Sequence, residues 1–147
     1  MIEQLDELYR EVILDHFRSP RNVGELPHAG IKAEGTNPLC GDEITFWLKL
    51  DNGRIQAVHF LGKGCAISQA AGSMLTEALR GKTLAEAANL TAAMRRLMQG
   101  QEPDPTLDLG DLEALAGVRK FPVRVKCAAL SWNVIEQGFE DYKKRNQ

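Results

Sequence analysis

The chain has 147 residues, of which 44% are hydrophobic and 26% are charged, so it can bury one ordinary hydrophobic core. We expect a single domain over residues 1–147. The net charge of −2 disfavours nucleic-acid binding, because phosphate contacts need a concentrated excess of Lys and Arg. No apolar run of about 18 residues occurs, which predicts no membrane-spanning helix.

The first residues mix acidic side chains into an apolar pattern. They lack the basic start, continuous apolar middle and small-residue cleavage site of a signal peptide, so we expect the protein in the cytoplasm. The chain has three cysteines, Cys40, Cys65 and Cys127. Because the cytoplasm keeps thiols reduced, they indicate a metal site, a reactive thiol or simple burial in preference to a disulfide.

The first predicted element is a helix over residues 2–18. Its apolar residues recur in steps of three and four and are Leu5, Leu8, Tyr9, Val12, Ile13 and Phe17. Pro20 disfavours helical backbone at Ser19, so the helix should end there. Residues 20–41 are rich in glycine and proline, which predicts a loop with one short strand around 31–36.

Two strands follow the loop. Apolar and polar residues alternate from Asp42 to Leu50, as in a strand with one buried face, and residues 55–61 form a second such run. Asn52 and Gly53 lie between them and favour a two-residue hairpin turn, in which both central residues need positive φ. Counting from that turn pairs position 44 with 61, 42 with 63 and 40 with 65.

This predicted register places Cys40, Asp42 and Cys65 on one face of the hairpin. Directly opposed residues lie about 4.5 to 5.5 Å apart at Cα, near enough for two sulfurs to bind one ion. A bulge at glycine 41, 62 or 64 would shift the pairing by one residue. We interpret the pair as a metal or reactive-thiol site, with two inert buried thiols or a cross-strand disulfide as the alternatives.

Helices dominate the remainder of the chain. Small and apolar residues at helical spacing predict one helix from Cys65 to about Gly81, and a capping-box sequence at Thr83 starts another that runs to about Met98. A loop at 101–110 and a short helix at 111–116 follow. Pro122 suits the first turn of a last helix. Its apolar face would carry Val123, Cys127, Leu130, Val134, Ile135 and Tyr142.

Zinc takes four ligands from thiolate, imidazole and carboxylate groups. Asp42 is the natural third ligand; its alternative role is a surface pair with Lys63, which would contribute little stability. Cys127 would be the fourth ligand, although a cysteine on an apolar helical stripe is more often part of the core. Cys65 and Cys127 would both lie near helix starts, where the helix dipole favours the thiolate.

The histidines are weaker candidates for ligands. His59 is expected to lie opposite Phe46, inside or at the edge of the core. A hydrogen-bonded structural role therefore suits His59 better than a metal-binding one.

Four motifs occur in the order found in a known family. They are DHFRSPRNVG, NPLCGD, GKGC at the start of a helix, and Cys127 ahead of a long final helix. The chain resembles the IscU-type proteins of iron–sulfur cluster assembly, which include the N-terminal domains of NifU-like proteins. The resemblance implies an α+β fold with a small, mostly antiparallel three-stranded sheet and helices packed on one face. It also matches Cys40, Asp42, Cys65 and Cys127 to the ligands of the family's metal or cluster site.

Two departures from the cluster-building scaffolds stand out. Those proteins usually have a histidine just before the third cysteine, where this chain has Lys126. They also carry a Leu-Pro-Pro-Val-Lys stretch that a chaperone recognises, where this chain reads KFPVR at residues 120–124. The chain also has extra sequence around 102–119. With Lys126 in place of histidine, this insertion makes the chain resemble the SufU branch, whose members are described as zinc-binding sulfur acceptors for a pyridoxal-phosphate cysteine desulfurase.

The SufU resemblance implies Zn²⁺ on the four ligands and Cys40 as the sulfur acceptor. It implies a SufS-like cysteine desulfurase and the downstream iron–sulfur assembly machinery as partners. A protonated lysine has no free lone pair and cannot replace imidazole as a ligand. Lys63, Arg124 and Lys126 could instead offset the charge of three thiolates and a carboxylate around zinc. The alternatives are a true scaffold that assembles a [2Fe–2S] cluster on the same residues, and a non-catalytic adaptor with a structural zinc.

Overall fold

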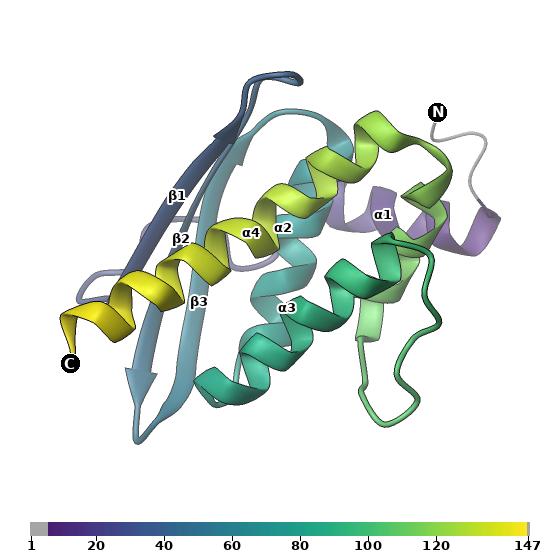
Figure 1. Ribbon diagram of the computed structural model, residues 1–147. Helices are drawn as coiled ribbons and strands as arrows, with labels where there is room; N and C mark the ends of the chain where they lie inside the picture. Colours follow the sequence, from purple (N-terminus) through teal and green to yellow (C-terminus); the bar gives the residue numbers. More distant parts are fainter. Residues whose placement is uncertain (1–5, 147) are drawn as a thin grey trace.

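A computed structural model describes residues 6–146 of the chain. Its elements are α1 (Glu7–Arg18), β1 (Ile31–Asn37), β2 (Asp42–Asp51), β3 (Arg54–Lys63), α2 (Ala66–Leu79), α3 (Leu84–Met98), the 3-10 helix η2 (Gly110–Lys120) and α4 (Pro122–Arg145). The strands form one antiparallel sheet in the order β1-β2-β3. Helices α2 and α4 pack on the same face of this sheet (Figure 1). The predicted α+β fold is confirmed.

Alternation along the strands places the core between the sheet and these helices. Ile44, Phe46 and Leu48 of β2 are buried, whereas Glu43 and Lys49 are exposed. The short strand predicted around 31–36 is confirmed as β1 and extends one residue further. No helix among residues 6–146 has the length and apolarity needed to cross a membrane.

The hairpin between β2 and β3 differs from its predicted register by one residue. Asn52 and Gly53 have φ of 51° and 76°, as the two-residue turn requires. A bulge between Lys49 and Leu50 then shifts every later pair, so position 44 faces 62 and 43 faces 63. The predicted pairs 44–61, 42–63 and 40–65 are therefore wrong. The extra residue is Gln56, and not one of the glycines 41, 62 and 64 at which we had considered a bulge.

The same shift corrects the predicted position of His59. It pairs with Trp47, while Phe46 pairs with Phe60 in the buried layer. His59 is half-buried, and its Nδ1 lies 3.4 Å from the carbonyl oxygen of Glu25. A hydrogen-bonded structural histidine remains the better description.

Helix α1 has a narrower buried face than the sequence suggested. It begins at Glu7, where the side chain of Asp6 accepts a hydrogen bond from the N–H of Leu8. Ile13 is buried, but Leu8 is 68% exposed and Phe17 is 43% exposed. Leu5, part of the predicted stripe, lies outside the described residues.

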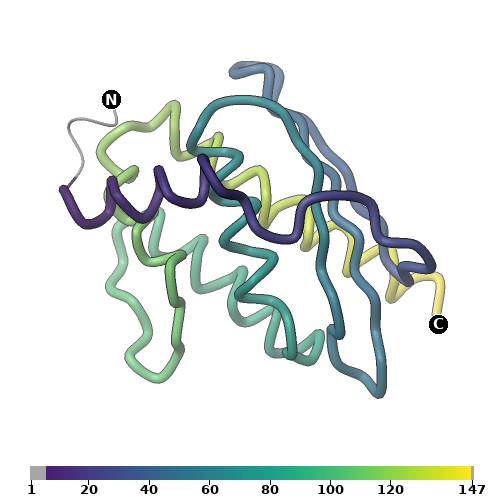
Figure 2. The backbone as a smooth tube through the Cα atoms, turned by 180° about the vertical axis from the view of Figure 1, so that it is seen from behind, coloured from purple at the N-terminus to yellow at the C-terminus, as the bar shows by residue number. Residues whose placement is uncertain are grey.

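The segment after α1 crosses β3, as the view from behind shows, and forms an isolated bridge between Val23 and Phe60 (Figure 2). The N–H of Phe60 donates to the carbonyl of Asn22, and the carbonyl of Phe60 accepts from the N–H of Gly24. The N···O distance is 2.9 Å in each bond. Asn22 also donates its side-chain amide to Thr76 of α2. The DHFRSPRNVG motif thus links α1, β3 and α2 through hydrogen bonds.

The later helices follow the predictions with two differences. The capping box at Thr83 and Glu86 is present at the start of α3. Helix η2 spans Gly110–Lys120 and is longer than the short helix expected at 111–116. Most predicted core positions of α4 are buried, but Val123 is 60% exposed and does not belong to that face.

Candidate metal centre

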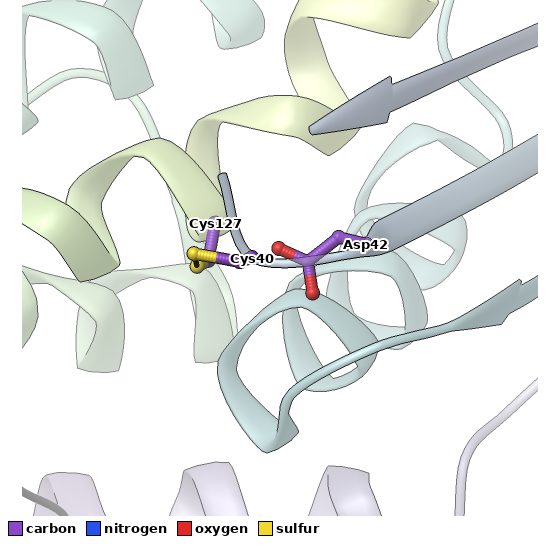
Figure 3. A group of neighbouring side chains, drawn as sticks. All are labelled: Cys40, Asp42 and Cys127. Carbon is purple, nitrogen blue, oxygen red and sulfur yellow. Dashed lines mark hydrogen bonds between the residues drawn. The ribbon is translucent and has the colours of Figure 1, made fainter. Parts of the chain in front are cut away.

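Three side chains from two distant parts of the chain meet at one end of the sheet (Figure 3). Cys40 lies in the turn between β1 and β2, Asp42 is the first residue of β2, and Cys127 lies in the second turn of α4. One ligand atom of each lies within 4.8 Å of the other two. Cys40 Sγ and Cys127 Sγ are 3.0 Å apart, and all three cysteines of the chain are free thiols.

The separation of these two sulfurs suits a shared ion after a small movement. Two sulfurs bound tetrahedrally to one zinc at about 2.3 Å would lie about 3.8 Å apart. Cys127 is fixed within a helix, whereas Cys40 is half-buried in a turn. An outward movement of Cys40 alone would therefore open the space for the ion.

Asp42 is buried, with 1% of its surface exposed, and one of its carboxylate oxygens is fully engaged. Oδ1 accepts hydrogen bonds from the N–H of Cys65 at 3.0 Å and from the hydroxyl of Ser68 at 3.1 Å. Oδ2 has only the amide of Asn37 at 3.5 Å and points toward the two sulfurs (Figure 3). Asp42 is therefore oriented as a ligand. It is not the partner of Lys63, which forms an ion pair with Glu43 at 3.2 Å.

Gly64, in the GKGC motif, makes this orientation of Asp42 sterically feasible. Its φ is +145°, and a Cβ at this position would collide with Oδ1 of Asp42. Gly41, by contrast, has φ of +68° with open space around it, so it serves the turn alone. The absence of a side chain is thus needed at Gly64.

Cys65 is the N-cap of α2 and is half-buried. Its sulfur is not part of the group whose atoms all lie within 4.8 Å, so the structure places it beside the other three candidates and not among them. Its charge still acts on the site, because it contributes to the raised pKa values of Cys127 and Arg124. Cys40 lies in the β1–β2 turn and Cys65 lies beyond the end of β3, so the two cysteines do not pair across the hairpin as predicted.

Cys127 is completely buried, and this changes the expected electrostatics. Burial raises the pKa of its thiol well above the ordinary value, and the contacts with Cys40 and Asp42 and the charge of Cys65 raise it further. In the metal-free protein, burial therefore opposes the thiolate that the helix start was expected to favour at Cys127. A bound divalent cation would supply the charge that reverses this preference.

The three candidate cations differ in their positions. Arg124 is half-buried, and its Nη1 lies 4.0 Å from Cys127 Sγ. The hydrogen bond to that sulfur raises the pKa of the Arg124 guanidinium, and the charge of Cys65 raises the same pKa further. Lys63 is engaged with Glu43, and Lys126 is exposed. Arg124 is the candidate with a contact to a sulfur among the described residues, and the charge-balancing roles of the two lysines stay predictions.

The sequence interpretation missed two groups that hold the site. Ser68 lies one helical turn after Cys65, and its hydroxyl lies within hydrogen-bond distance of both Asp42 Oδ1 and the carbonyl of Cys65. Asn37, which opens the NPLCGD motif, is buried between Asp42 Oδ2 and Cys127 Sγ. Their polar type within the motifs was the available signal, but their partners depend on tertiary packing.

A second group of ligand-type side chains involves the buried His16 with Glu77 and Asp111. His16 Nδ1 and Nε2 lie 2.8 Å from Ser73 Oγ and Asp111 Oδ2 respectively. Ser73 Oγ already accepts from the N–H of Arg21, so its hydroxyl proton is free to donate to Nδ1. The ring proton then lies on Nε2 and is donated to Asp111. His16 therefore joins η2 to α1 and α2 and offers no free lone pair.

The fold and the site together define a small α+β protein with a candidate metal centre made of thiol and carboxylate groups at one end of an antiparallel sheet. Residues 8–128 match the family described as the NifU-like N terminal domain, and the chain belongs to this family.

Individual relatives agree with this assignment. The chain is 48% identical over 134 residues to the zinc-dependent sulfurtransferase SufU of Bacillus subtilis (strain 168), covering 91% of this chain and 90% of the relative. It is 40% identical over 140 residues to the iron–sulfur cluster assembly scaffold protein IscU of Streptococcus pyogenes serotype M1. The match covers 95% of this chain and 87% of the relative.

A solved structure agrees as well. The crystal structure of a candidate iron–sulfur cluster assembly scaffold protein for the SUF system, from Fervidobacterium islandicum AW-1, has a TM-score of 0.82 at 36% identity, covering 87% of this chain and 93% of that one. These findings confirm the predicted resemblance to the IscU-like proteins of iron–sulfur cluster assembly and to the SufU branch.

Proposed function

We propose that this protein accepts sulfur on Cys40 from the persulfide of a SufS-like, pyridoxal-phosphate cysteine desulfurase and passes it to the iron–sulfur assembly machinery. Cys40, Asp42, Cys65 and Cys127 would hold a Zn²⁺ ion. The observation that carries the proposal is the contrast between Cys40, half-buried in a turn, and its neighbours Asp42 and Cys127, which are buried and fixed. The relative named as a zinc-dependent sulfurtransferase supports it.

The donor set fits zinc, because three sulfurs and one carboxylate oxygen are ligands that zinc takes at four-coordinate sites. Oδ2 of Asp42, which has only the long contact with the Asn37 amide, faces the sulfurs, as a ligand atom should. When bound, zinc would keep the thiols deprotonated and add folding free energy by joining the β1–β2 turn, α2 and α4. Reduced cysteines in this arrangement suit a reducing compartment such as the cytoplasm.

Cys40 reacts as a free thiolate. Its sulfur attacks the outer sulfur of the desulfurase persulfide, forming a new sulfur–sulfur bond on Cys40 as the old one breaks. The desulfurase cysteine leaves as a thiolate, so no external oxidant or reductant is needed. A thiolate engaged as a ligand is a weaker nucleophile, so Cys40 must be released from that role before it attacks.

The surrounding residues allow Cys40 to move without loss of the site. Asp42 is held by the Cys65 N–H and the Ser68 hydroxyl, and Cys127 is held inside α4. Arg124 Nη1 lies 4.0 Å from Cys127 Sγ and can stabilise negative charge that develops on the sulfurs. These anchored groups keep the fold together while Cys40 carries the transferred sulfur.

Metal analysis and mass spectrometry test the proposal. Purified protein should contain one zinc, and incubation with a desulfurase and cysteine should add sulfur to Cys40 of the wild type and none to Cys40→Ser. The Cys40→Ser variant should still bind the desulfurase. A Cys40→Ser variant that stimulates the desulfurase as the wild type does would exclude Cys40 as acceptor.

A relative named as an IscU scaffold supports a second function, namely assembly of a [2Fe–2S] cluster on the same residues. Anaerobic reconstitution with iron and sulfide separates the two: a stable iron chromophore that displaces zinc favours the scaffold. A non-catalytic adaptor with structural zinc predicts instead that the thiols resist alkylation and that no persulfide forms.

A further inference from the structure

Asn37 contacts each of the three residues whose side chains meet at the candidate centre. It is the last residue of β1 and lies opposite Asp42, the first residue of β2. Its carbonyl oxygen accepts a hydrogen bond of 3.2 Å from the N–H of Cys40. Its side-chain Nδ2 lies 3.5 Å from Asp42 Oδ2 and 4.0 Å from Cys127 Sγ. Asn37 thus uses its backbone for Cys40 and its side chain for the other two residues.

The local sequence explains the backbone contact. Asparagine is favoured at the first position of a β-turn and proline at the second, which is the order of Asn37 and Pro38. The hydrogen bond from Cys40 to Asn37 closes this turn. No hydrogen bond among residues 6–146 joins the Asn37 side chain to the Cys40 sulfur. Asn37 therefore holds the backbone of Cys40 and leaves its side chain able to move.

The side-chain amide suits the other two contacts. Asn37 is only 8% exposed, so its N–H groups have little access to water. A neutral amide carries two N–H donors and brings no charge of its own. Asp42 and Cys127 would both be anions when they bind an ion, and anionic acceptors form stronger hydrogen bonds than neutral ones. We expect the two long contacts to shorten in that state.

The amide of Asn37 also acts on a different oxygen from the other supports of Asp42. The Cys65 N–H and the Ser68 hydroxyl hold Oδ1 from the start of α2. Asn37 contacts Oδ2, the oxygen that faces the sulfurs, and reaches Cys127 with the same nitrogen. It therefore connects a ligand at the start of β2 with a ligand on α4.

We propose that Asn37 is a positioning residue of the metal centre, whose amide keeps Asp42 and Cys127 directed at the ion after Cys40 has left to carry sulfur. This inference rests on the proposed function, in which Cys40 is released from the ion before it reacts. The ion then keeps Asp42, Cys65 and Cys127, and two of these three contact the Asn37 amide. The Asn37 carbonyl keeps the turn closed while the Cys40 side chain moves.

Zinc affinity with and without the Cys40 thiol tests this role, measured by competition with a chromophoric chelator. Asn37→Ser keeps a residue suited to the first position of the turn, but its hydroxyl is too short to reach both ligands. We expect a loss of about tenfold in zinc affinity when Cys40 is present and of about 100-fold in the Cys40→Ala background. The second loss is larger because an ion with fewer ligands depends more on the alignment of each.

Asn37→Asp separates the amide from the turn. It keeps the shape and the turn preference, but it has no N–H and adds a negative charge beside ligands whose four charges already exceed the two of Zn²⁺. Its zinc affinity should fall further than that of Asn37→Ser. Asn133→Ser is the control, because Asn133 is exposed on α4 and its amide oxygen accepts from Arg95. The control should bind zinc as its parent does in both Cys40 backgrounds.

Co²⁺ in place of zinc gives a second readout, at the sulfurs themselves. Loss of the N–H contact to Cys127 changes how strongly that sulfur donates to the metal. The sulfur-to-cobalt charge-transfer absorption should therefore shift in Asn37→Ser and stay unchanged in Asn133→Ser. An absorption spectrum identical in both variants would contradict a contact between Asn37 and a ligand sulfur.

The outcomes separate the positioning role from the proposed function. If the wild type binds zinc and gains sulfur on Cys40, but both Asn37 variants bind zinc as tightly as the control, the positioning role is wrong. It is also wrong if Asn37→Ser loses the same factor with and without the Cys40 thiol, because a general effect on the fold is common to both backgrounds and cancels in this comparison. If the wild type binds no zinc or gains no sulfur on Cys40, the proposed function itself fails.

Discussion

The backbone N–H of Cys65 donates a hydrogen bond of 3.0 Å to Oδ1 of Asp42. The N-cap residue of α2 therefore orients the carboxylate of the first residue of β2. This bond, with that of Ser68, leaves the second oxygen of Asp42 for the sulfurs. The orientation of the Asp42 carboxylate in the candidate centre therefore depends on the connection between β3 and α2 and on the first turn of α2.

Removing the Ser68 hydroxyl should weaken metal binding without unfolding the protein. Hydrogen-bonded supports of metal ligands typically contribute 10- to 100-fold in affinity, so we expect Ser68→Ala to lower zinc affinity within about that range. Competition with a chromophoric chelator measures it. Ser131→Ala is the control, because Ser131 is equally buried but bonds only a carbonyl of its own helix. Equal affinities in both variants would contradict the role of Ser68.

Substitution of Gly64 should be far more damaging than substitution of Gly41. Both have positive φ, so alanine strains the backbone at either position by about 1 to 2 kcal/mol. Only at Gly64 would the added Cβ collide with Asp42. Gly64→Ala should lose zinc and additional stability in urea unfolding, whereas Gly41→Ala should show the backbone cost alone. Similar losses in the two variants would argue against a steric requirement at Gly64.

The metal-free protein should lose stability at alkaline pH because of Cys127. Its pKa is raised in the folded state, mainly by burial, so the folded protein keeps this proton where the unfolded chain releases it. This contribution is complete below the unfolded pKa of about 8.5 and declines as pH rises above it. Urea unfolding of metal-free protein between pH 7 and 10 measures the effect. Cys127→Ala should give a flatter profile, and an unchanged slope would refute the assignment.

The link between His16 and Asp111 should stabilise the attachment of η2. Asp111→Ala leaves the buried Nε2–H without a partner, which should cost about 1 to 3 kcal/mol in the free energy of unfolding. Asp111→Asn retains an acceptor oxygen and should cost less. Glu113→Gln, at an exposed position of the same helix, should be neutral. A larger loss in the asparagine variant than in the alanine variant would be inconsistent with a proton on Nε2.

Local patterns were sufficient to predict most of the fold. The alternation in β2, the turn at Asn52 and Gly53 and the capping box at Thr83 depend on neighbours in sequence, and each prediction is confirmed. The bulge at Gln56 was not predictable, because it depends on how β3 packs against the helices. A shift of one residue there was enough to invalidate the predicted pairs 44–61 and 42–63.

The candidate site was only partly accessible from sequence. Spacing indicated that Cys40, Asp42 and Cys65 lie near one another, but Cys127 is 87 positions from Cys40 and was placed by family resemblance. Ser68, Asn37 and the partners of His16 escaped prediction because their hydrogen bonds join distant segments. The exposure of Val123 was missed because helical spacing alone does not show where a neighbouring element ends.

The hydrogen bonds between Phe60 and residues 22–24 also affect the exposed edge of the sheet at β3. An unpaired strand at the side of a sheet is a template on which another polypeptide can extend the sheet, and such growth leads to aggregates. Here the N–H and C=O of Phe60 on that side of β3 are already bonded to the protein's own chain. This bridge interrupts the free edge of β3 and should hinder the addition of another strand there.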